Sequence, residues 1–327
     1  MRKPNIWLDF PIHPEALRML QEGAEVSGPF SKLDVPEAWS ALAEADGAVI
    51  SSRPKCNGAW MDRAPRIRVL ARSGIGYDNV EVGAATARGI CVVNTPEAPT
   101  EPTAEQAITF ILMLARRVKE SDRALSEGRW LSRPELEGTE VLGKTLGVIG
   151  LGRIGGRVSE VFSRGLRMRV ISYDPYIPDD RFPAKGAEKV SSLNELLRQA
   201  DFVTIHCPAT AETRGMANRD FFAGMKRGSF FVNTARGAVV VEADLFQALK
   251  SGHLSAAALD VFEEEPTPSD NPLLRLPNVV LSPHSASNSV EGNWRMHTGA
   301  VTEVLETLRN RRPRWLVNPE VWEHRRS

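Results

Sequence analysis

The sequence has few cysteines, and the three that it has lie far apart. Cys56, Cys91 and Cys207 are odd in number, which does not suit the disulfide framework of a small secreted protein, and none has zinc-like pairing. A signal peptide is not expected either, because Asp9 and Pro11 interrupt any apolar region before it reaches signal length. We therefore expect a cytoplasmic protein without a metal site.

The sequence also lacks an excess of one charge and a long hydrophobic run. Its 41 Lys and Arg residues balance 41 Asp and Glu residues, so we expect no binding to nucleic acid or to a membrane. The basic run at 309–314 is interpreted as a solvated helix end. The longest apolar stretch, 107–115, is about half of the roughly 20 residues that a membrane-spanning helix needs. It predicts a buried helix.

What the sequence does have is an alternation of apolar, strand-length runs with helical stretches. With 327 residues, 42% of them hydrophobic, the chain is long enough for two domains. Apolar runs that alternate with helices indicate parallel sheets covered on both sides. The runs lie at 48–50, 69–71, 146–149, 170–173, 202–205, 230–232, 256–259 and 279–281. Helices are predicted after the Ser192 cap, between Glu242 and Gly252, and at about 290–308.

A long segment at 103–143 separates two groups of these predicted strands. We therefore predict two α/β domains, each a Rossmann-like, doubly wound parallel sheet. The first contains residues 1–98 and 289–327, and the second, 99–288, is inserted into it. The active site is expected in the cleft between the two domains.

Three glycines follow the apolar run at 146–149. Gly150, Gly152 and Gly155 have the spacing of a dinucleotide-binding turn, in which they allow a tight bend, close approach of a pyrophosphate and helix packing. The pyrophosphate then lies at a helix N-terminus, which favours anions. Asp174 ends the next run, where it would bind the ribose hydroxyls and repel the extra phosphate of NADP. NAD is the predicted cofactor; the alternative is a purely structural turn.

A second phosphate-binding pattern overlaps this region. Residues 138–145, GTEVLGKT, match the loop of nucleotide triphosphatases letter for letter. That loop must follow a strand and open a helix, whereas Lys144 and Thr145 lead directly into the predicted strand at 146–149. The context therefore argues against a triphosphatase.

Three more motifs follow successive predicted strands: NTARG at 233–237, LDVFEEEP at 259–266 and SPHSA at 282–286. With the glycine turn, they make nearly the whole chain resemble the D-isomer-specific 2-hydroxyacid dehydrogenases, which include formate, glycerate and phosphoglycerate dehydrogenases. The resemblance implies a catalytic arginine, glutamate and histidine. These fall on Arg236, Glu265 and His284.

The three residue types suit hydride transfer beside a carboxylate. A proton must pass to or from the substrate oxygen, and His284 follows a strand at the edge where open sheets bind ligands. His206 also ends a strand and is the rival. Glu265 would stabilise the protonated imidazole, unless it belongs only to a solvated acidic run. Arg236 would donate to a carboxylate and to the developing oxyanion, unless it only ends a strand in a surface turn.

The resemblance also implies supporting contacts. Asp260 would accept from the nicotinamide amide, and Cys207 has no base and acid that would make it a nucleophile. The further implied cofactor contacts are Thr103, Arg153, Ile154, Cys207, Thr213, Thr234, Ala235 and Ala286. In the first domain, which would bind substrate, the backbone amides of Ser73, Gly74 and Ile75 would hold the substrate carboxylate together with Arg236.

We expect an NAD-dependent enzyme that interconverts a small 2-keto acid and its D-2-hydroxy acid. The family resemblance also implies a homodimer built through the cofactor domain. The chain stops soon after its last helix, without the regulatory domain of many phosphoglycerate dehydrogenases, which favours hydroxypyruvate or glyoxylate as substrate. D-3-phosphoglycerate dehydrogenase activity is the alternative. An NAD-sensing corepressor would instead bind NADH with negligible turnover, and the intact catalytic trio argues against it.

Overall fold

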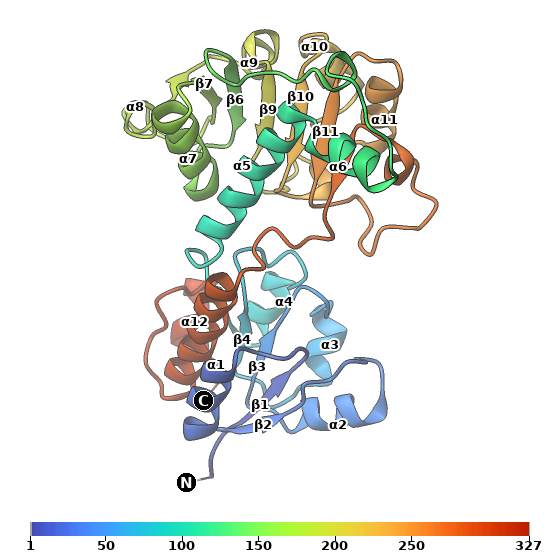
Figure 1. Ribbon diagram of the computed structural model, residues 1–327. Coiled ribbons are helices and arrows are strands. Elements are labelled where there is room, and N and C mark those ends of the chain that lie inside the picture. The colour runs from blue at the N-terminus through green and yellow to red at the C-terminus, as the bar shows by residue number, and fades with distance from the viewer. Residues whose placement is uncertain (1, 327) are drawn as a thin grey trace. The chain divides into compact units, whose positions relative to one another are not determined.

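The structure is a computed structural model that describes residues 2–326 (Figure 1). The chain divides into two compact units. Unit 1 contains Met1–Pro99 and Asn288–Ser327, and unit 2 contains Thr100–Ser287. No helix among the described residues is both long and apolar enough to cross a membrane.

Unit 1 contains a five-stranded parallel sheet with the order β2-β1-β3-β4-β5. The strands are β1 (Asn5–Leu8), β2 (Glu25–Ser27), β3 (Gly47–Ile50), β4 (Val69–Arg72) and β5 (Cys91–Val93). Successive side chains point to opposite faces: Ile6 and Leu8 join one apolar cluster and Trp7 joins another. Both faces are therefore buried, which explains why β3 and β5 are apolar throughout and β1 and β4 largely so, whereas the edge strand β2 is polar and partly exposed.

Helices cover both faces of this sheet. α1 (Pro14–Gly23) and α12 (Val290–Leu308) supply apolar side chains to the cluster that contains Ile6. The other cluster receives side chains from α2 (Pro36–Ala43), α3 (Gly58–Asp62) and α4 (Val82–Ala87). Of the basic run near the end of α12, Arg309 and Arg311 pair with Glu306, which agrees with a solvated helix end.

Unit 2 contains a seven-stranded parallel sheet with the order β12-β11-β10-β9-β6-β7-β8. The strands are β6 (Thr145–Ile149), β7 (Arg169–Tyr173), β8 (Glu188–Lys189), β9 (Phe202–Ile205), β10 (Phe230–Asn233), β11 (Ala256–Leu259) and β12 (Val279–Leu281). From β6, the chain adds β7 and β8 on one side of the sheet and then β9 to β12 on the other side. A ligand-binding crevice is expected where the strand order reverses, at the carboxyl ends of β6 and β9.

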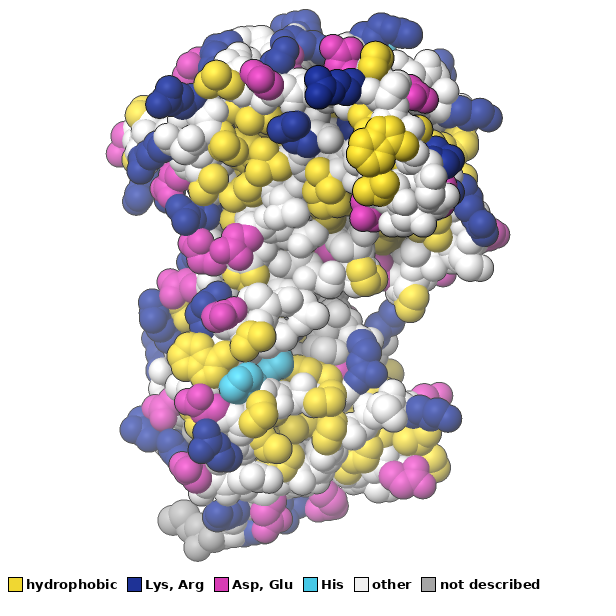
Figure 2. All heavy atoms as spheres, viewed as in Figure 1, with side chains coloured by type: hydrophobic (Ala, Val, Ile, Leu, Met, Phe, Trp, Pro, Cys, Tyr) yellow, Lys and Arg dark blue, Asp and Glu magenta, His cyan; other side chains and the backbone are white. Residues whose placement is uncertain are grey.

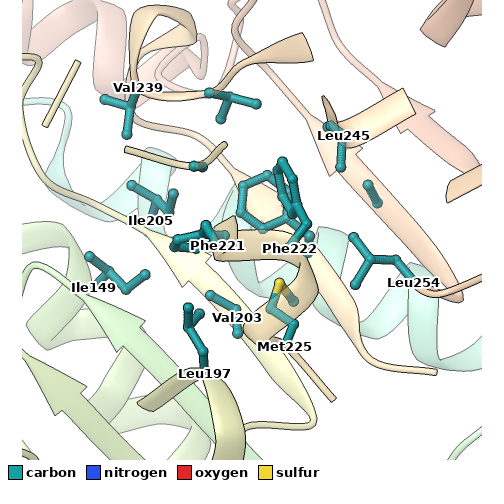
Figure 3. Close-up of a cluster of buried hydrophobic side chains, with 14 of the residues drawn as sticks. Ile149, Leu197, Val203, Ile205, Phe221, Phe222, Met225, Val239, Leu245 and Leu254 are labelled. Atoms are coloured by element: carbon teal, nitrogen blue, oxygen red, sulfur yellow. The ribbon is translucent and has the colours of Figure 1, made fainter. Parts of the chain in front are cut away.

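Two apolar layers cover this sheet. One face packs against α5 (Thr100–Arg116) and α7 (Arg153–Glu160). The other packs against α9 (Leu193–Gln199), α10 (Arg219–Gly224) and α11 (Glu242–Lys250), where Phe221 and Phe222 (Figure 3) meet each other and Phe231 edge to face at 5.3–6.1 Å between ring centroids. Two covered parallel sheets confirm the predicted fold class.

The eight predicted strands are present, and the structure adds β1, β2, β5 and β8. β2 and β8 are polar and partly or fully exposed, so they carry a weak apolar signal. β1 and β5 are short but buried and largely apolar, and they were not predicted from the sequence. The remaining elements are α6 (Val118–Ser126), α8 (Arg181–Ala184), a π-helix at Val161–Gly165, and 3₁₀ turns at Pro134–Leu136, Gly237–Val239, Pro272–Arg275 and Pro319–His324.

Candidate active site

The glycine turn joins β6 to α7. Gly150 has φ +87°, and a Cβ there would lie 2.8 Å from the backbone nitrogen of Cys207. A Cβ on Gly155 would overlap the carbonyl oxygen of Gly150. Both positions therefore need glycine for the fold itself, because the turn is tight and α7 packs closely on it.

Gly152 differs from the other two glycines. It is the N-cap residue of α7, and a Cβ there would meet no described atom within 4 Å. Space is therefore open beside the first turn of the helix, where Arg153 and Ile154 present their amides. A pyrophosphate fits this arrangement, because the open space and the helix N-terminus both favour an anion that approaches the backbone closely.

Asp174 follows β7 and lies against the glycine turn. Its Oδ2 accepts a hydrogen bond from the Leu151 N–H at 2.9 Å, and its Oδ1 accepts one from the Tyr176 N–H at 3.0 Å. Each carboxylate oxygen can accept more than one hydrogen bond, so both keep capacity for hydroxyl donors. The carboxylate is thus fixed beside the turn in a suitable place to bind a ribose.

The loop after β10 carries Arg236 and is held by a buried side chain. The Asn233 Nδ2 donates to the carbonyl oxygen of Arg236, and its Oδ1 accepts from the Ala235 N–H, both at 2.9 Å. Arg236 Nη1 donates to the Ala235 carbonyl oxygen at 2.7 Å. The Thr234 Oγ1 is buried and has no hydrogen-bond partner among the described residues.

Glu265 and His284 form a hydrogen-bonded pair. The Glu265 Oε2 lies 2.6 Å from the His284 Nδ1, and the Glu265 Oε1 accepts from the Phe262 N–H at 3.0 Å. Burial opposes ionisation of Glu265, but its hydrogen bonds and the nearby charges of His284 and Arg236 outweigh burial and lower its pKa. With Nδ1 bonded to the carboxylate, Nε2 is the ring nitrogen left to exchange a proton with a substrate.

The loop that carries His284 is fixed by Asp260, which is 1% exposed. Asp260 Oδ1 accepts from the Ser285 N–H at 2.8 Å and from the Ser282 hydroxyl, and Oδ2 accepts from the Ala286 N–H at 3.0 Å. The His284 N–H donates to the Asp260 carbonyl oxygen at 2.7 Å. Asp260 therefore orients the histidine loop, whereas the sequence indicated only a contact with the nicotinamide.

Asn233 and Ser282 were missed by sequence reasoning. They belong to the motifs at 233–237 and 282–286, but their role is to support the loops and not to touch a ligand, which a motif alone does not show. A buried Asn at the end of a strand and a Ser two residues before the histidine are the signals that could have drawn attention to them.

His206, the rival histidine, is partly buried, and its Nδ1 has no hydrogen-bond partner among the described residues. Its Nε2 lies 3.0 Å from the Thr204 hydroxyl, and burial lowers its pKa to about 3. Among the described residues, no charged group acts on it as Glu265 acts on His284. A neutral, desolvated imidazole suits a structural role better than proton transfer.

Three weaker candidates lie elsewhere in unit 2. Burial, with a smaller effect of the Asp174 charge, raises the pKa of Cys207 to about 11, so its thiol stays protonated. The Thr213 hydroxyl donates to the Pro208 carbonyl oxygen at 2.6 Å in the turn after β9. Thr103 is buried in the first turns of α5.

Among the described residues, no group of three or more His, Cys, Asp or Glu side chains could hold a metal ion.

The glycine loop of unit 1 follows β4. The Ser73 N–H donates to the Ile50 carbonyl oxygen at 2.9 Å, and the Gly74 N–H donates to the Thr95 hydroxyl at 2.8 Å. Of the three amides expected to bind a carboxylate, that of Ile75 has no acceptor among the described residues. The Asn94 Nδ2 donates to the Ile75 carbonyl oxygen at 2.8 Å and so fixes this peptide.

Comparison with known proteins agrees with this geometry. Residues 108–286 match the family model of the D-isomer specific 2-hydroxyacid dehydrogenase, NAD binding domain, which confirms the prediction of an NAD-binding domain. The chain is 39% identical over 326 residues to a glyoxylate reductase of Korarchaeum cryptofilum, covering 98% of this chain and 97% of the relative.

Two other relatives extend the comparison. A D-3-phosphoglycerate dehydrogenase of Methanocaldococcus jannaschii is 40% identical over 308 residues, which is 94% of this chain. The chain spans only 58% of that relative's length. The crystal structure of the TT0316 protein from Thermus thermophilus superposes with a TM-score of 0.87 at 36% identity, covering 96% of this chain and 99% of that one.

Proposed function

The chain belongs to the D-isomer-specific 2-hydroxyacid dehydrogenase family, and from this premise we propose that it interconverts a small 2-keto acid and its D-2-hydroxy acid with NAD. The observation that carries the proposal is the 2.6 Å contact between Glu265 Oε2 and His284 Nδ1, with Arg236 close enough to affect the pKa of the same carboxyl group. A carboxylate-bound imidazole beside a guanidinium suits proton transfer to a carbonyl that neighbours a carboxylate.

The proposed cofactor residues lie along the carboxyl ends of β6, β7 and β10. The amides of Arg153 and Ile154 would bind the pyrophosphate beside Gly152, and Asp174 would accept from the ribose hydroxyls. The Thr234 hydroxyl, which has no partner among the described residues, would form a hydrogen bond with the nicotinamide half of the cofactor. When bound, NAD supplies the carbon that gives or accepts the hydride.

The chain's own residues would provide the rest of the chemistry. In the direction of reduction, His284 Nε2 donates a proton to the substrate oxygen, and Glu265 stabilises the protonated ring through Nδ1. Arg236 donates to the substrate carboxylate and to the oxygen on which negative charge develops. In unit 1, the Ile75 N–H is the backbone donor that we assign to the carboxylate.

For the substrate we propose glyoxylate or hydroxypyruvate rather than a phosphorylated acid. Arg53 follows β3, the neighbour of β4, and is a candidate to bind a phosphate at this edge of unit 1. Its Nε lies 3.5 Å from the buried Asp9 carboxylate, and its Nη atoms donate to the carbonyl oxygens of Ser31 and Phe30. Because the Arg53 guanidinium already binds these groups, we do not assign it to a substrate phosphate. This supports a substrate with a small, uncharged side chain.

The test is a steady-state assay of a panel of 2-keto acids with NADH and NADPH, together with His284→Ala. We expect the variant to lose about 100-fold or more in kcat/KM while NADH binding, measured by fluorescence, is kept. His253→Ala, which changes a histidine bonded to the Met225 carbonyl oxygen, is the matched control. Unchanged turnover in His284→Ala, or NADH binding with negligible turnover of every acid in the wild type, would contradict the proposal.

We further propose that the protein forms a homodimer through unit 2. Figure 2 shows hydrophobic side chains at the surface of unit 2. Val118, Leu125, Trp130 and Leu142, on and after α6, are 44–89% exposed. Several large apolar side chains exposed in one segment favour an interface there. Light scattering should give twice the chain mass of 36.0 kDa. A variant that carries both Leu125→Asp and Trp130→Ser should be monomeric. The control Val290→Ser, which changes an exposed apolar residue of unit 1, should remain a dimer. A monomeric wild type would contradict the proposal.

A further inference from the structure

Tyr176 connects the segment after β7 to the turn after β9. Its hydroxyl donates a hydrogen bond to the Glu212 Oε2, and its backbone N–H donates to the Asp174 Oδ1 at 3.0 Å. The Tyr176 side chain is otherwise 73% exposed. An exposed tyrosine thus joins two carboxylates that lie far apart in the sequence.

The sheet order shows where this connection lies. β6 lies between β9 and β7, and Glu212 belongs to the turn after β9 while Tyr176 follows β7 (Figure 1). From this order we infer that the hydrogen bond between the two spans the carboxyl end of β6, where the glycine turn begins. This is also the place where the adenosine half of a dinucleotide lies in doubly wound sheets.

The Glu212 turn is held in place by its own hydrogen bonds. The Glu212 N–H donates to the Thr210 hydroxyl at 3.3 Å, and the Thr210 N–H donates to the Thr213 hydroxyl at 2.8 Å. The carboxylate is therefore anchored both through its backbone and through Tyr176.

Negative charge accumulates at this end of the sheet. The hydrogen bond to Glu212, burial, and the charges of Glu212 and Asp174 raise the pKa of Tyr176. Asp174 also contributes to the raised pKa of Cys207, after burial. The two carboxylates thus act on the same neighbourhood. A dianionic phosphate placed there would be repelled by both.

We propose that Glu212, positioned by Tyr176, is a second determinant of cofactor choice, which acts with Asp174 to exclude nucleotides that carry a phosphate on the adenosine ribose. Tyr176 is a positioning residue, because its hydroxyl donates a hydrogen bond to the Glu212 carboxylate. The inference rests on the proposed NAD-dependent function and deepens it, since it assigns discrimination against NADP to a residue outside the glycine turn and Asp174.

The test measures dissociation constants for NADH and NADPH by nucleotide fluorescence, without any substrate. Glu212→Gln removes the charge and keeps the side-chain shape, so the ratio of the NADPH to the NADH constant should fall about fivefold, mainly through tighter NADPH binding. Tyr176→Phe keeps the Glu212 charge but removes the hydrogen bond that holds the Glu212 carboxylate in place. It should lower the ratio by about twofold. Asp174→Asn combined with Glu212→Gln should lower the ratio more than either change alone.

Asp220→Asn, which removes an exposed carboxylate at the start of α10, is the matched control and should leave the ratio unchanged. The fivefold effect should shrink at high salt, because exposed charges are screened. A Glu212→Gln ratio that equals that of the control would overturn the inference while NADH still binds. Failure of the wild type to bind NADH would instead overturn the proposed function.

Discussion

Gly237 packs against the carbonyl oxygen of Phe262 so closely that a Cβ at position 237 would lie well under 3.0 Å from that oxygen. Gly237 follows Arg236 in the loop after β10, and the Phe262 N–H donates to the Glu265 Oε1 in the loop after β11. The contact between one glycine and one peptide therefore sets the distance between the loop of the arginine and the loop of the glutamate.

Gly237→Ala should disrupt this relationship. The added methyl group would overlap peptide atoms rather than the end of a flexible side chain, so the two loops must separate. We expect a loss of about 100-fold or more in kcat/KM, and a lower melting temperature because overpacking costs about 1–3 kcal/mol. Gly165→Ala is the control, since a Cβ there meets no described atom within 4 Å. Equal melting temperature and activity in the two variants would show that the contact is unimportant.

The three glycines of the dinucleotide turn should respond differently to substitution. A Cβ on Gly155 would overlap the Gly150 carbonyl oxygen, so Gly155→Ala should lower the melting temperature of the protein. Gly152→Ala meets no described atom and should melt like the wild type, but its methyl group would occupy the space assigned to the pyrophosphate. We expect its dissociation constant for NADH to rise about tenfold or more. A normal NADH constant in Gly152→Ala would contradict the placement of the pyrophosphate.

Asp260 should support catalysis by orienting the His284 loop. In Asp260→Asn the amide nitrogen cannot accept, so at least one of its three donors loses its partner. We expect kcat to fall about 10- to 100-fold in a folded protein, because a lost buried hydrogen bond costs about 1–3 kcal/mol. Ser282→Ala, which removes a single donor, should have a smaller effect of the same kind.

Ser285→Ala is the matched control for Ser282→Ala. Ser285 contributes only its backbone N–H to Asp260, which alanine keeps. The pH profile of kcat/KM separates positioning from stability, because a misplaced imidazole alters the profile whereas a merely less stable fold does not. Identical profiles and kcat values in Ser282→Ala and Ser285→Ala would argue against a positioning role for the Ser282 hydroxyl.

His206 should make the protein sensitive to acid. Its pKa is lowered to about 3 by burial, below the ordinary value of 6.5, so the folded state binds fewer protons than the unfolded state between these values. Its contribution to stability is complete above about pH 6.5 and is lost as the pH falls towards 3, at roughly 1.4 kcal/mol per pH unit.

Urea unfolding between pH 7.5 and 4.5 measures this effect. His206→Gln keeps a polar side chain but cannot gain the proton, so its free energy of unfolding should depend less on pH than that of the wild type. His253→Gln replaces a histidine of the same unit that is bonded to the Met225 carbonyl oxygen, and should retain the wild-type slope. Parallel slopes in all three proteins would exclude His206 as the source of acid sensitivity.

Much of the fold could be predicted from local patterns. Apolar runs of four residues or so identified eight strands, and Ser192 caps α9 as predicted, with its hydroxyl accepting from the Glu195 N–H at 3.2 Å. The pattern at 138–145 precedes β6 instead of following a strand, and no helix begins at Lys144, as its context indicated. These features depend on neighbours within a few residues, which a sequence displays directly.

Other features could not be read in this way. β5 is covered by the segment near the C-terminus, where the buried Asn318 accepts from the Val92 N–H at 2.9 Å and donates to the Ile90 carbonyl oxygen at 3.0 Å. Asn318 is 226 residues from Val92 in the chain. No local pattern connects the two, because only the packing of α12 on the sheet of unit 1 brings them together.

The sequence by itself determined the Rossmann-like fold class and the glycine turn, because strand burial and the steric freedom of glycine are local properties. It also supplied candidate residues, but their partners depended on the tertiary structure. Parallel pairing of β10, β11 and β12 brings together loops that lie 20 to 30 residues apart, about the spacing of such strands. That pairing gave His284 a carboxylate partner in Glu265, left His206 buried without one, and made Asp260 the support of the histidine loop.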